Sequence, residues 1–138
     1  EKGLCVLHSD IDGALEVYPN DSFDFVILSQ SLQQVKRIDD VLKESLRIGK
    51  KVIIAFPNFA HISLRFMLFF QGRAPVTKCL PDRWNDTPNI RFLSIKDFEI
   101  FCKEKQYKIV EKYFISNSRY SRILPNLFAQ LAIFVITK

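Results

Sequence analysis

Apolar residues in this sequence gather in short, dense runs that are separated by polar and turn-forming residues. Three such runs lie in the first half of the chain, at residues 4–8, 23–30 and 51–56. Each run is followed by residues that favour turns, and this arrangement predicts strands. Because these strands are apolar on both faces, they are typical of a parallel sheet that helices cover.

The segment between the second and third runs has the period of an amphipathic helix. Its apolar residues Ile38, Val41, Leu42 and Leu46 fall on one stripe, two aspartates lie in its first turn, and Gly49 follows its end. Acidic residues are favourable at a helix N-terminus, and glycine commonly ends a helix. A strand, a helix and a strand in this order predict a βαβ unit with parallel strands and a right-handed crossover.

The second half begins with a nearly continuous apolar segment at residues 59–70. We expect a helix here that is covered on most sides, because a helix that is apolar all round needs burial. Near its start, His61 is expected to be a packing or capping residue rather than a base. Residues 71–93 are broken by one glycine and three prolines, which predicts a long loop. Loops of this length are usually functional or mobile.

The last part of the chain predicts one helix and two strands. Ser94 and Asp97 have the spacing of a capping box, so a helix is expected from there to about residue 105. Three apolar residues would then face inward, namely Ile95, Phe98 and Cys102. Residues 107–115 and 127–137 are expected to be strands, the second arguably starting near residue 129, and to form a hairpin-like antiparallel pair.

Composition places the chain among ordinary globular domains. It has 138 residues, of which 48% are hydrophobic and 25% charged, so we expect one α/β domain over residues 1–138. The net charge of +5 is uneven, because residues 71–138 carry twelve basic and six acidic residues. No basic cluster denser than a pair occurs, which argues against a nucleic-acid partner.

The cysteines and histidines exclude two further classes of protein. Cys5, Cys79 and Cys102 are odd in number and widely spaced, which favours a reduced, cytoplasmic chain over a disulfide framework. His8 and His61 have no cysteine or carboxylate at metal-ligand spacing, so no metal site is predicted. The longest apolar stretch is too short and too broken to span a bilayer, and no leader opens the chain, so no membrane partner is expected.

Candidate chemistry lies where the first two predicted strands end. Ligands of open parallel sheets bind beyond the carboxyl ends of the strands. Residues 8–12 follow the first strand, and Asp10 there fits either a ligand's donors or an Asx-turn, which is the commoner outcome. Residues 29–33 follow the second strand and fit a ligand contact or a solvated loop equally well. Neither a nucleophile elbow nor a glycine-rich phosphate loop occurs in the sequence.

Four segments resemble one known family. They read DSFDFVILSQSLQ, VLKESLRIGKKVIIAFPNFAH, WNDTPNIRFLSIKDF and LPNLFAQLAIFVI. Together they resemble the methionine biosynthesis protein MetW family, which looks like a class I S-adenosylmethionine-dependent methyltransferase fold. The resemblance covers essentially the whole chain. It implies a Rossmann-like three-layer sandwich with strands ordered 3-2-1-4-5-7-6 and the last strand antiparallel.

On this map the sequence is truncated before the third strand. Residues 4–8 would be the third strand, 23–29 the fourth and 52–56 the fifth, so the first two strands have no counterpart. The fourth strand would then have an open edge. We expect one of three ways to satisfy this edge. Strand 4–8 pairs directly with strand 23–29, or a second copy supplies the pairing in a homo-oligomer, or the segment is the ordered part of a longer protein.

The resemblance also implies a cofactor and a partner. Asp10 and Ile11 resemble the residues that contact the adenine of S-adenosylmethionine, and Ser29 and Gln30 resemble those beside its methionine moiety. The glycine-rich loop and the ribose-binding acid have no counterpart in this sequence. Proteins of this family act alongside a homoserine O-acyltransferase, which implies an accessory role in methionine biosynthesis. The alternative is a methyltransferase of an unidentified small molecule, with residues 71–93 as its lid.

Overall fold

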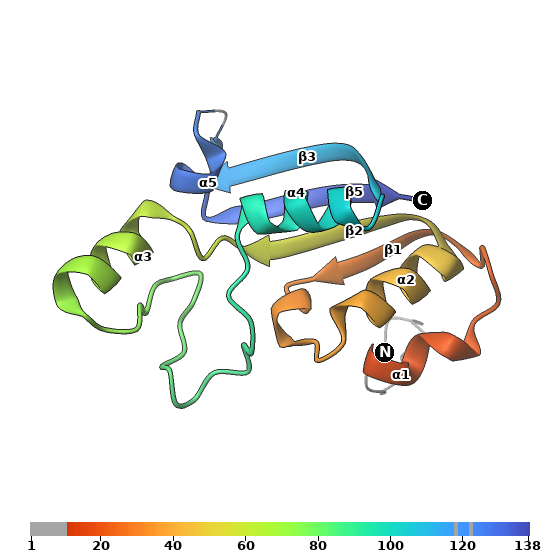
Figure 1. Cartoon of the computed structure of the whole chain (residues 1–138), viewed down its shortest axis with the longest axis horizontal. Helices are drawn as coiled ribbons and strands as arrows, with labels where there is room; N and C mark the ends of the chain where they lie inside the picture. Colours follow the sequence, from red (N-terminus) through yellow and green to blue (C-terminus); the bar gives the residue numbers. More distant parts are fainter. Residues whose placement is uncertain (1–10, 118, 122) are drawn as a thin grey trace, which may run out of the picture.

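The computed structural model describes residues 11–117, 119–121 and 123–138 (Figure 1). The strand expected at residues 4–8 lies outside them. The elements along the chain are α1 (Ile11–Ala14), the 3₁₀ turn η1 (Leu15–Val17), β1 (Phe23–Ser29), the 3₁₀ turn η2 (Leu32–Gln34), α2 (Ile38–Ile48), β2 (Gly49–Pro57), α3 (Ile62–Phe66), the π-helical turn η3 (Met67–Gln71), α4 (Ile95–Glu104), β3 (Lys108–Ser116), β4 (Arg119–Tyr120), α5 (Pro125–Phe128) and β5 (Leu131–Thr137).

The strands form one mixed sheet in the order β1-β2-β5-β3-β4. β1 and β2 are parallel and α2 connects them, which confirms the predicted βαβ unit. β5 lies antiparallel to both β2 and β3, and this confirms the antiparallel pair expected at the end of the chain. In the numbering of the expected fold, the strands from β1 to β3 follow the order 4-5-7-6.

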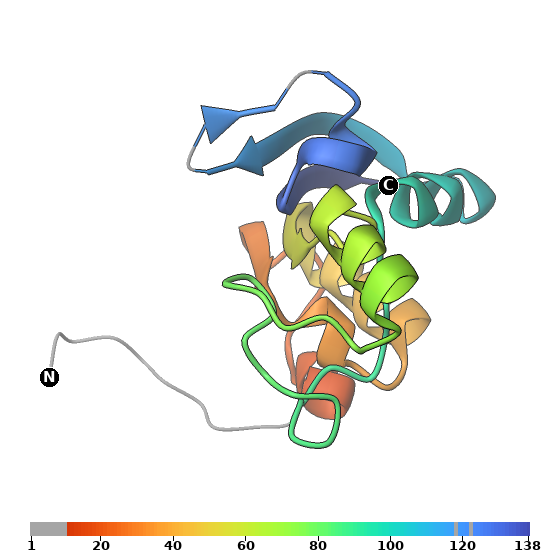
Figure 2. The same cartoon turned by 90° about the vertical axis from the view of Figure 1, so that its left-hand side faces the viewer.

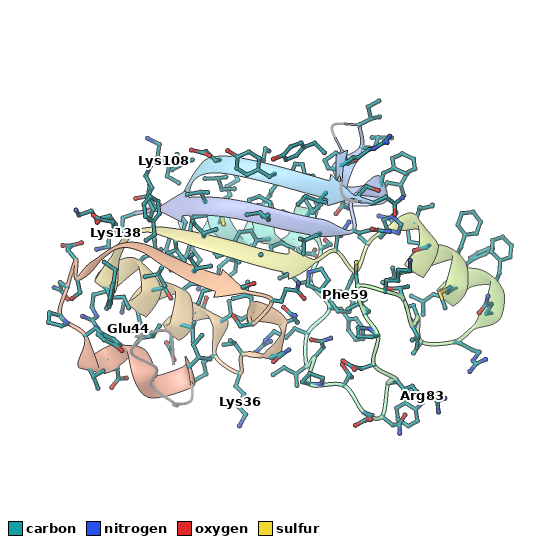
Figure 3. All side chains as sticks on the ribbon, turned by 180° about the vertical axis from the view of Figure 1, so that it is seen from behind. Lys36, Glu44, Phe59, Arg83, Lys108 and Lys138 are labelled. Carbon is teal, nitrogen blue, oxygen red and sulfur yellow. The ribbon has the colours of Figure 1, made fainter. Side chains whose placement is uncertain are left out.

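Helices α2 and α4 cover the same face of this sheet (Figures 1 and 3). On β2, the alternate residues Val52, Ile54 and Phe56 are fully buried beneath them, and on β5 so are Phe134 and Ile136. Of the three expected layers, the described residues therefore form the sheet and one helical layer. The opposite face carries exposed apolar side chains, most of all on β1.

Aromatic rings make the centre of the core. The rings of Phe56 and Phe134 stack on neighbouring strands with centroids 5.8 Å apart, and Phe98 of α4 lies 4.9 Å from Phe134. Ile95 and Cys102 of the same helix are buried as predicted. Such aromatic contacts add to the stabilisation from buried area, so this cluster joins α4 to the middle of the sheet.

The capping box predicted for α4 is present. The Ser94 hydroxyl accepts a hydrogen bond from the Asp97 amide at 3.1 Å, and a carboxylate oxygen of Asp97 accepts one from the Ser94 amide at 3.3 Å. Both donors would otherwise lack a partner at the helix end. The start of this helix is therefore encoded locally.

α2 ends at the predicted glycine, but for a different reason. The φ angle of Gly49 is −121°, which is extended backbone that any residue adopts. A β carbon added at Gly49 would instead lie 2.5 Å from Cγ2 of Val26 and 3.2 Å from the carbonyl oxygen of Ser45. The glycine is thus required by the close approach of β1 and α2, not by a left-handed turn.

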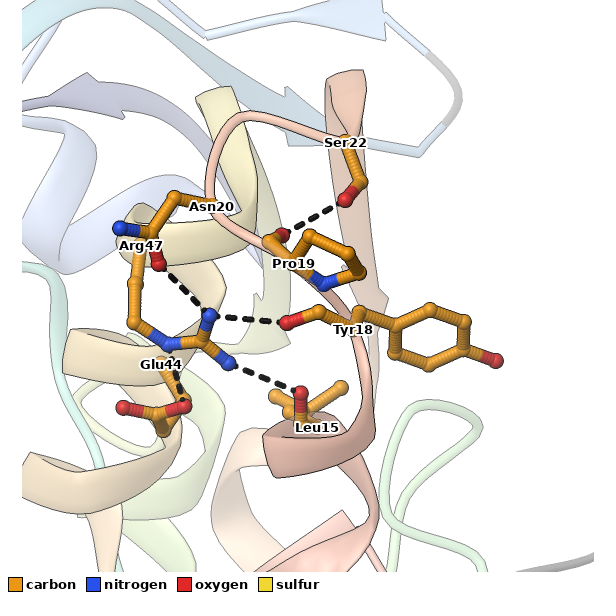
Figure 4. Close-up of polar contacts among 7 residues, drawn as sticks. All are labelled: Leu15, Tyr18, Pro19, Asn20, Ser22, Glu44 and Arg47. Atoms are coloured by element: carbon orange, nitrogen blue, oxygen red, sulfur yellow. Dashed lines mark hydrogen bonds and ion pairs between the residues drawn. The ribbon is translucent and has the colours of Figure 1, made fainter.

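Arg47 at the end of α2 holds the segment before β1 in place (Figure 4). Its Nη1 donates to the carbonyl of Tyr18 and to Oδ1 of Asn20, each at 2.8 Å, and its Nη2 donates to the carbonyl of Leu15 at 3.1 Å. Its Nε lies 2.7 Å from Oε2 of Glu44. One guanidinium therefore joins α2 to η1 and to the turn that leads into β1.

The apolar segment at residues 59–70 differs from its prediction. Its helix begins only at Ile62, changes to a π-helical turn at Met67, and ends at Gly72, whose φ angle of 59° lies in the left-handed region. The expectation that this helix is covered on most sides is wrong. Among the residues of α3 and η3, only Leu64 is buried, because α3 projects beyond the end of the sheet instead of packing on it (Figures 1 and 2).

The final strand is shorter than predicted. Residues 127 and 128 belong to α5, which has Pro125 at its start, and β5 begins only at Leu131. The side-chain amide of Asn58 donates to the carbonyls of Asn126 and Ala129 at 3.1 and 2.8 Å. These bonds keep the segment before β5 in a turn, and they come from a residue about seventy positions away that no local pattern reveals.

Candidate ligand site at the carboxyl ends of the parallel strands

The parallel strands β1 and β2 end at the same edge of the sheet, the edge that faces α3 and the loop of residues 71–93 (Figure 1). Ser29 is the last residue of β1 and pairs with Ala55 of β2. The amide of Gln30 donates to the Ala55 carbonyl at 2.7 Å, and Gln30 has a left-handed φ angle of 51°. The side chains of Ser29 and Gln30 are exposed at this edge, where the sequence predicted them.

The turn after Gln30 is held by a buried amide. Gln33 is only 4% exposed, and its Nε2 donates to the carbonyl of Gln30 at 2.8 Å. Its Oε1 is buried and has no hydrogen-bond partner, and the same is true of Oδ1 of Asn89. A buried acceptor without a donor is unfavourable, so these two oxygens reduce the stability of the segments that contain them.

The loop of residues 71–93 is attached to this turn at its far end. The amides of Ile90 and Arg91 donate to the carbonyl of Gln33 at 3.0 and 3.2 Å. The Arg91 side chain donates from Nε to the carbonyl of Val35 at 3.1 Å, and from Nη2 to the carbonyl of Lys36. The loop therefore reaches the candidate site at a defined place, directly beside the end of β1.

A small cavity of about 120 Å³ lies at the end of β2, and His61, Lys78 and Cys79 are among the residues that line it. His61 is the N-cap of α3, because its Nδ1 accepts from the amide of Ser63 at 3.2 Å. Burial lowers the pKa of His61, and a hydrogen bond to the backbone of Phe128 opposes that shift only in part. His61 is thus a capping residue, as the sequence predicted.

The other two predicted site residues are not found at this edge. Asp10 lies outside the described residues. Ile11 is half-buried in α1 and lines a different cavity of about 230 Å³ against the first half of α2, beside Asp40 and Glu44. Ser29 and Gln30 are not among the described residues that line that cavity. The structure therefore brings Ser29 and Gln30 together and places Ile11 on another surface.

Sequence reasoning missed Gln33, Asn89 and Arg91. Gln33 lies in the polar cluster after β1, but burial of its amide could not be inferred from spacing. Asn89 and Arg91 come from a loop more than fifty residues later, and their proximity depends on tertiary packing. The specific segment that contains them, WNDTPNIRFLSIKDF, was the available signal.

Known proteins of the same architecture define the class. A crystal structure of an S-adenosylmethionine-dependent methyltransferase from Archaeoglobus fulgidus superimposes with a TM-score of 0.65, at 15% identity, over 100% of this chain and 69% of that chain. Another from Thermotoga maritima gives 0.62, at 18% identity, over 99% of this chain and 64% of that one. At such identities the likeness establishes the fold, which is that of a class I S-adenosylmethionine-dependent methyltransferase.

The sequence comparison defines the family within that class. The model of the family "Methionine biosynthesis protein MetW" matches residues 1–136. The bifunctional methionine biosynthesis protein MetXA/MetW of Rhodopirellula baltica is 36% identical over 126 residues, which are 91% of this chain and 20% of that protein. The chain therefore belongs to the MetW family, and it spans about a fifth of the length of this relative.

None of the helices in the described part of the chain has the length and hydropathy that a transmembrane span requires.

Proposed function

We propose that this chain acts in the cytoplasm as an accessory protein of methionine biosynthesis and works with a homoserine O-acyltransferase. The observation that carries the proposal is the relative from Rhodopirellula baltica, whose name joins a MetXA and a MetW function in one polypeptide. Two domains on one polypeptide have a high effective concentration relative to each other, which favours their binding to each other. When the two proteins are separate chains, they need a docking surface to associate.

We further propose that the site at the ends of β1 and β2 contacts S-adenosylmethionine. Ser29 and Gln30 would face the methionine moiety of the cofactor and Asp10 would contact its adenine, whereas Ile11, which lies on another surface, is left out of this site. The exposure of Ser29 and Gln30 at the carboxyl edge supports the first pair. When bound, the cofactor supplies an electron-poor methyl group.

A second candidate function is that of a small-molecule methyltransferase with the loop of residues 71–93 as its lid. The attachment of this loop beside the end of β1, through Arg91, favours it. Methyl transfer depends mainly on holding a nucleophile in line with the methyl group, so the lack of an obvious general base is compatible with this activity.

A second copy of the chain is a further partner to consider. Within the described residues β1 pairs only with β2, so its other edge offers backbone groups to another strand. We propose that two copies join through this edge. Analytical ultracentrifugation at several concentrations tests this, and a single species of monomer mass at every concentration would contradict it.

The accessory role is tested by adding the purified full chain to a purified homoserine O-acyltransferase from the same organism. We expect co-elution and a changed acylation rate. No association at micromolar concentration, together with an unchanged rate, would reject the proposal. Incubation of the chain with labelled S-adenosylmethionine and candidate small molecules tests the second function, for which transfer of the label is the expected result.

The cofactor contacts are tested by calorimetry with S-adenosylmethionine. We expect Asp10→Ala and Ser29→Ala to weaken binding about tenfold or more, in the range that loss of one good polar contact gives. Asp24→Ala is the matched control, because Asp24 is exposed at the opposite end of β1. Equal affinity in all three variants would remove Asp10 and Ser29 from the site.

A further inference from the structure

The projecting helix carries a cluster of exposed phenylalanines. Phe66, Phe69 and Phe70 are 53%, 81% and 69% exposed, although phenylalanine is normally buried. With Ile62 and Arg65 they line a shallow depression of about 370 Å³. We call these five residues the aromatic knuckle.

The rings of the aromatic knuckle are packed against one another. Phe66 and Phe70 stack with centroids 5.2 Å apart, and Phe69 meets Phe70 edge to face at 4.9 Å. Phe69 and Phe70 lie in the π-helical turn at Met67–Gln71, and such turns are frequent at functional sites. Rings that are already ordered lose little side-chain entropy when they bind, so this surface is organised before any partner arrives.

The sequence on either side of the aromatic knuckle carries charges of one sign. Residues 59–81 contain Arg65, Arg73 and Lys78 and no acidic residue. Nε of Arg65 donates to the carbonyl of Ala60 at 2.6 Å, which keeps its guanidinium next to the rings. An apolar centre with a basic border is complementary to an apolar pocket with an acidic border.

The aromatic knuckle lies apart from a second exposed apolar surface. That second surface is the uncovered face of the sheet, where Phe25 and Ile27 of β1 are 55% and 66% exposed. α3 instead projects beyond the carboxyl ends of β1 and β2 and covers neither face (Figures 1 and 3). The aromatic knuckle and the uncovered sheet face are therefore two separate surfaces.

We propose that the aromatic knuckle is the surface through which this chain docks on the homoserine O-acyltransferase, in an apolar pocket bordered by carboxylates. The proposal rests on the proposed accessory function and names the residues that perform it. A few large aromatic side chains commonly supply most of the binding energy of an interface. Phe69 and Phe70 are therefore the central contacts, and Arg65 and Arg73 form ion pairs around them.

The test compares variants of the full chain in binding to the immobilised acyltransferase. We expect Phe69→Ala/Phe70→Ala to weaken binding more than tenfold, and Arg73→Glu to weaken it and to reduce its dependence on salt. Phe25→Ala is the matched control, since it removes an exposed phenylalanine from the sheet face, and its affinity should stay within about twofold of the wild type. Circular dichroism verifies that each variant is folded.

The outcomes separate the two proposals. If the wild-type chain does not bind the acyltransferase, the accessory function itself fails. If the wild-type chain binds and the double variant binds equally well, the accessory function remains and the aromatic knuckle is not its docking surface. The same double variant is tested on vesicles of phosphatidylglycerol and by ultracentrifugation. Loss of vesicle binding or of self-association, with acyltransferase binding unchanged, would overturn the proposal in favour of a lipid or a second copy.

Discussion

Gly49 and Val26 approach each other so closely that Cγ2 of Val26 occupies the space of a β carbon on Gly49, at 2.5 Å. This contact lies where α2 passes into β2, beside β1. It fixes how near the helix and the two parallel strands can come. Any side chain at Gly49 must therefore push β1 or α2 away.

We expect Gly49→Ala to reduce the free energy of unfolding by about 1–3 kcal/mol, the range found when an extra carbon is forced into a packed interior. Urea denaturation measures it. Because the clash is with Val26, the double variant Gly49→Ala/Val26→Ala should lose less than the sum of the two single variants. Gly13→Ala is the control, since a β carbon at Gly13 meets nothing within 4 Å. Strict additivity of the first pair would contradict the assigned clash.

Arg47 should be important for the segment before β1. Arg47→Met removes its bonds to four backbone and side-chain oxygens while keeping the aliphatic stem, and should cost about 2 kcal/mol of unfolding free energy. Hydrogen exchange should accelerate at η1 and the turn after it, and not in β5. Lys43→Met on the same helix is the control, because Lys43 is exposed. Uniform acceleration across the sheet would argue that Arg47 acts globally.

The stability of the protein should fall on mild acidification because of His61. Its pKa lies below the ordinary value in the folded state, so the unfolded chain binds the proton more readily. The stabilisation from neutral His61 is therefore complete above about pH 6.5 and is lost as the pH decreases through the folded pKa. His61→Asn keeps a side-chain acceptor at the helix start without this titration. The difference in unfolding free energy between wild type and variant should shrink between about pH 7.5 and about pH 5.5, and a constant difference would contradict the assignment.

The two cysteines that the structure describes should differ sharply in reactivity. Cys102 is fully buried, and burial raises the pKa of its thiol to about 12, whereas Cys79 is half-exposed. Only the thiolate reacts with iodoacetamide. Peptide mapping after a brief treatment of the native protein should find Cys79 modified and Cys102 intact, and both modified in urea. Equal labelling of the two under native conditions would mean that α4 opens readily.

The elements that the sequence predicted best are those whose signals are local. The stripe of Ile38, Val41, Leu42 and Leu46 gave α2, and Ser94 with Asp97 gave the start of α4, because both patterns act within a few residues. The alternation of burial on β2 was not predicted, because the sequence indicated a strand covered by helices and the described helices cover one face of it.

The elements that it predicted poorly depend on distant contacts. The continuous apolar residues at 59–70 indicated a buried helix. Hydrophobicity alone, however, does not distinguish a helix in the core from an apolar helix at the surface, and Phe69 is exposed at the surface. The late start of β5 depends on Asn58. For the candidate site, the rule on carboxyl ends found Ser29 and Gln30, whereas Gln33 and Arg91 come together only through folding of the loop.

The order of strands in the sheet has a consequence for synthesis on the ribosome. Of the five described strands, β5 is made last, yet it lies between β2 and β3 and provides the ladder that joins them. Until β5 emerges, the parallel pair β1–β2 and the antiparallel pair β3–β4 are two separate units, and each has an unpaired strand edge where β5 will later bind. The nascent polypeptide therefore needs protection until β5 has emerged, and a stalled chain lacking β5 would be a natural client for chaperones and proteases.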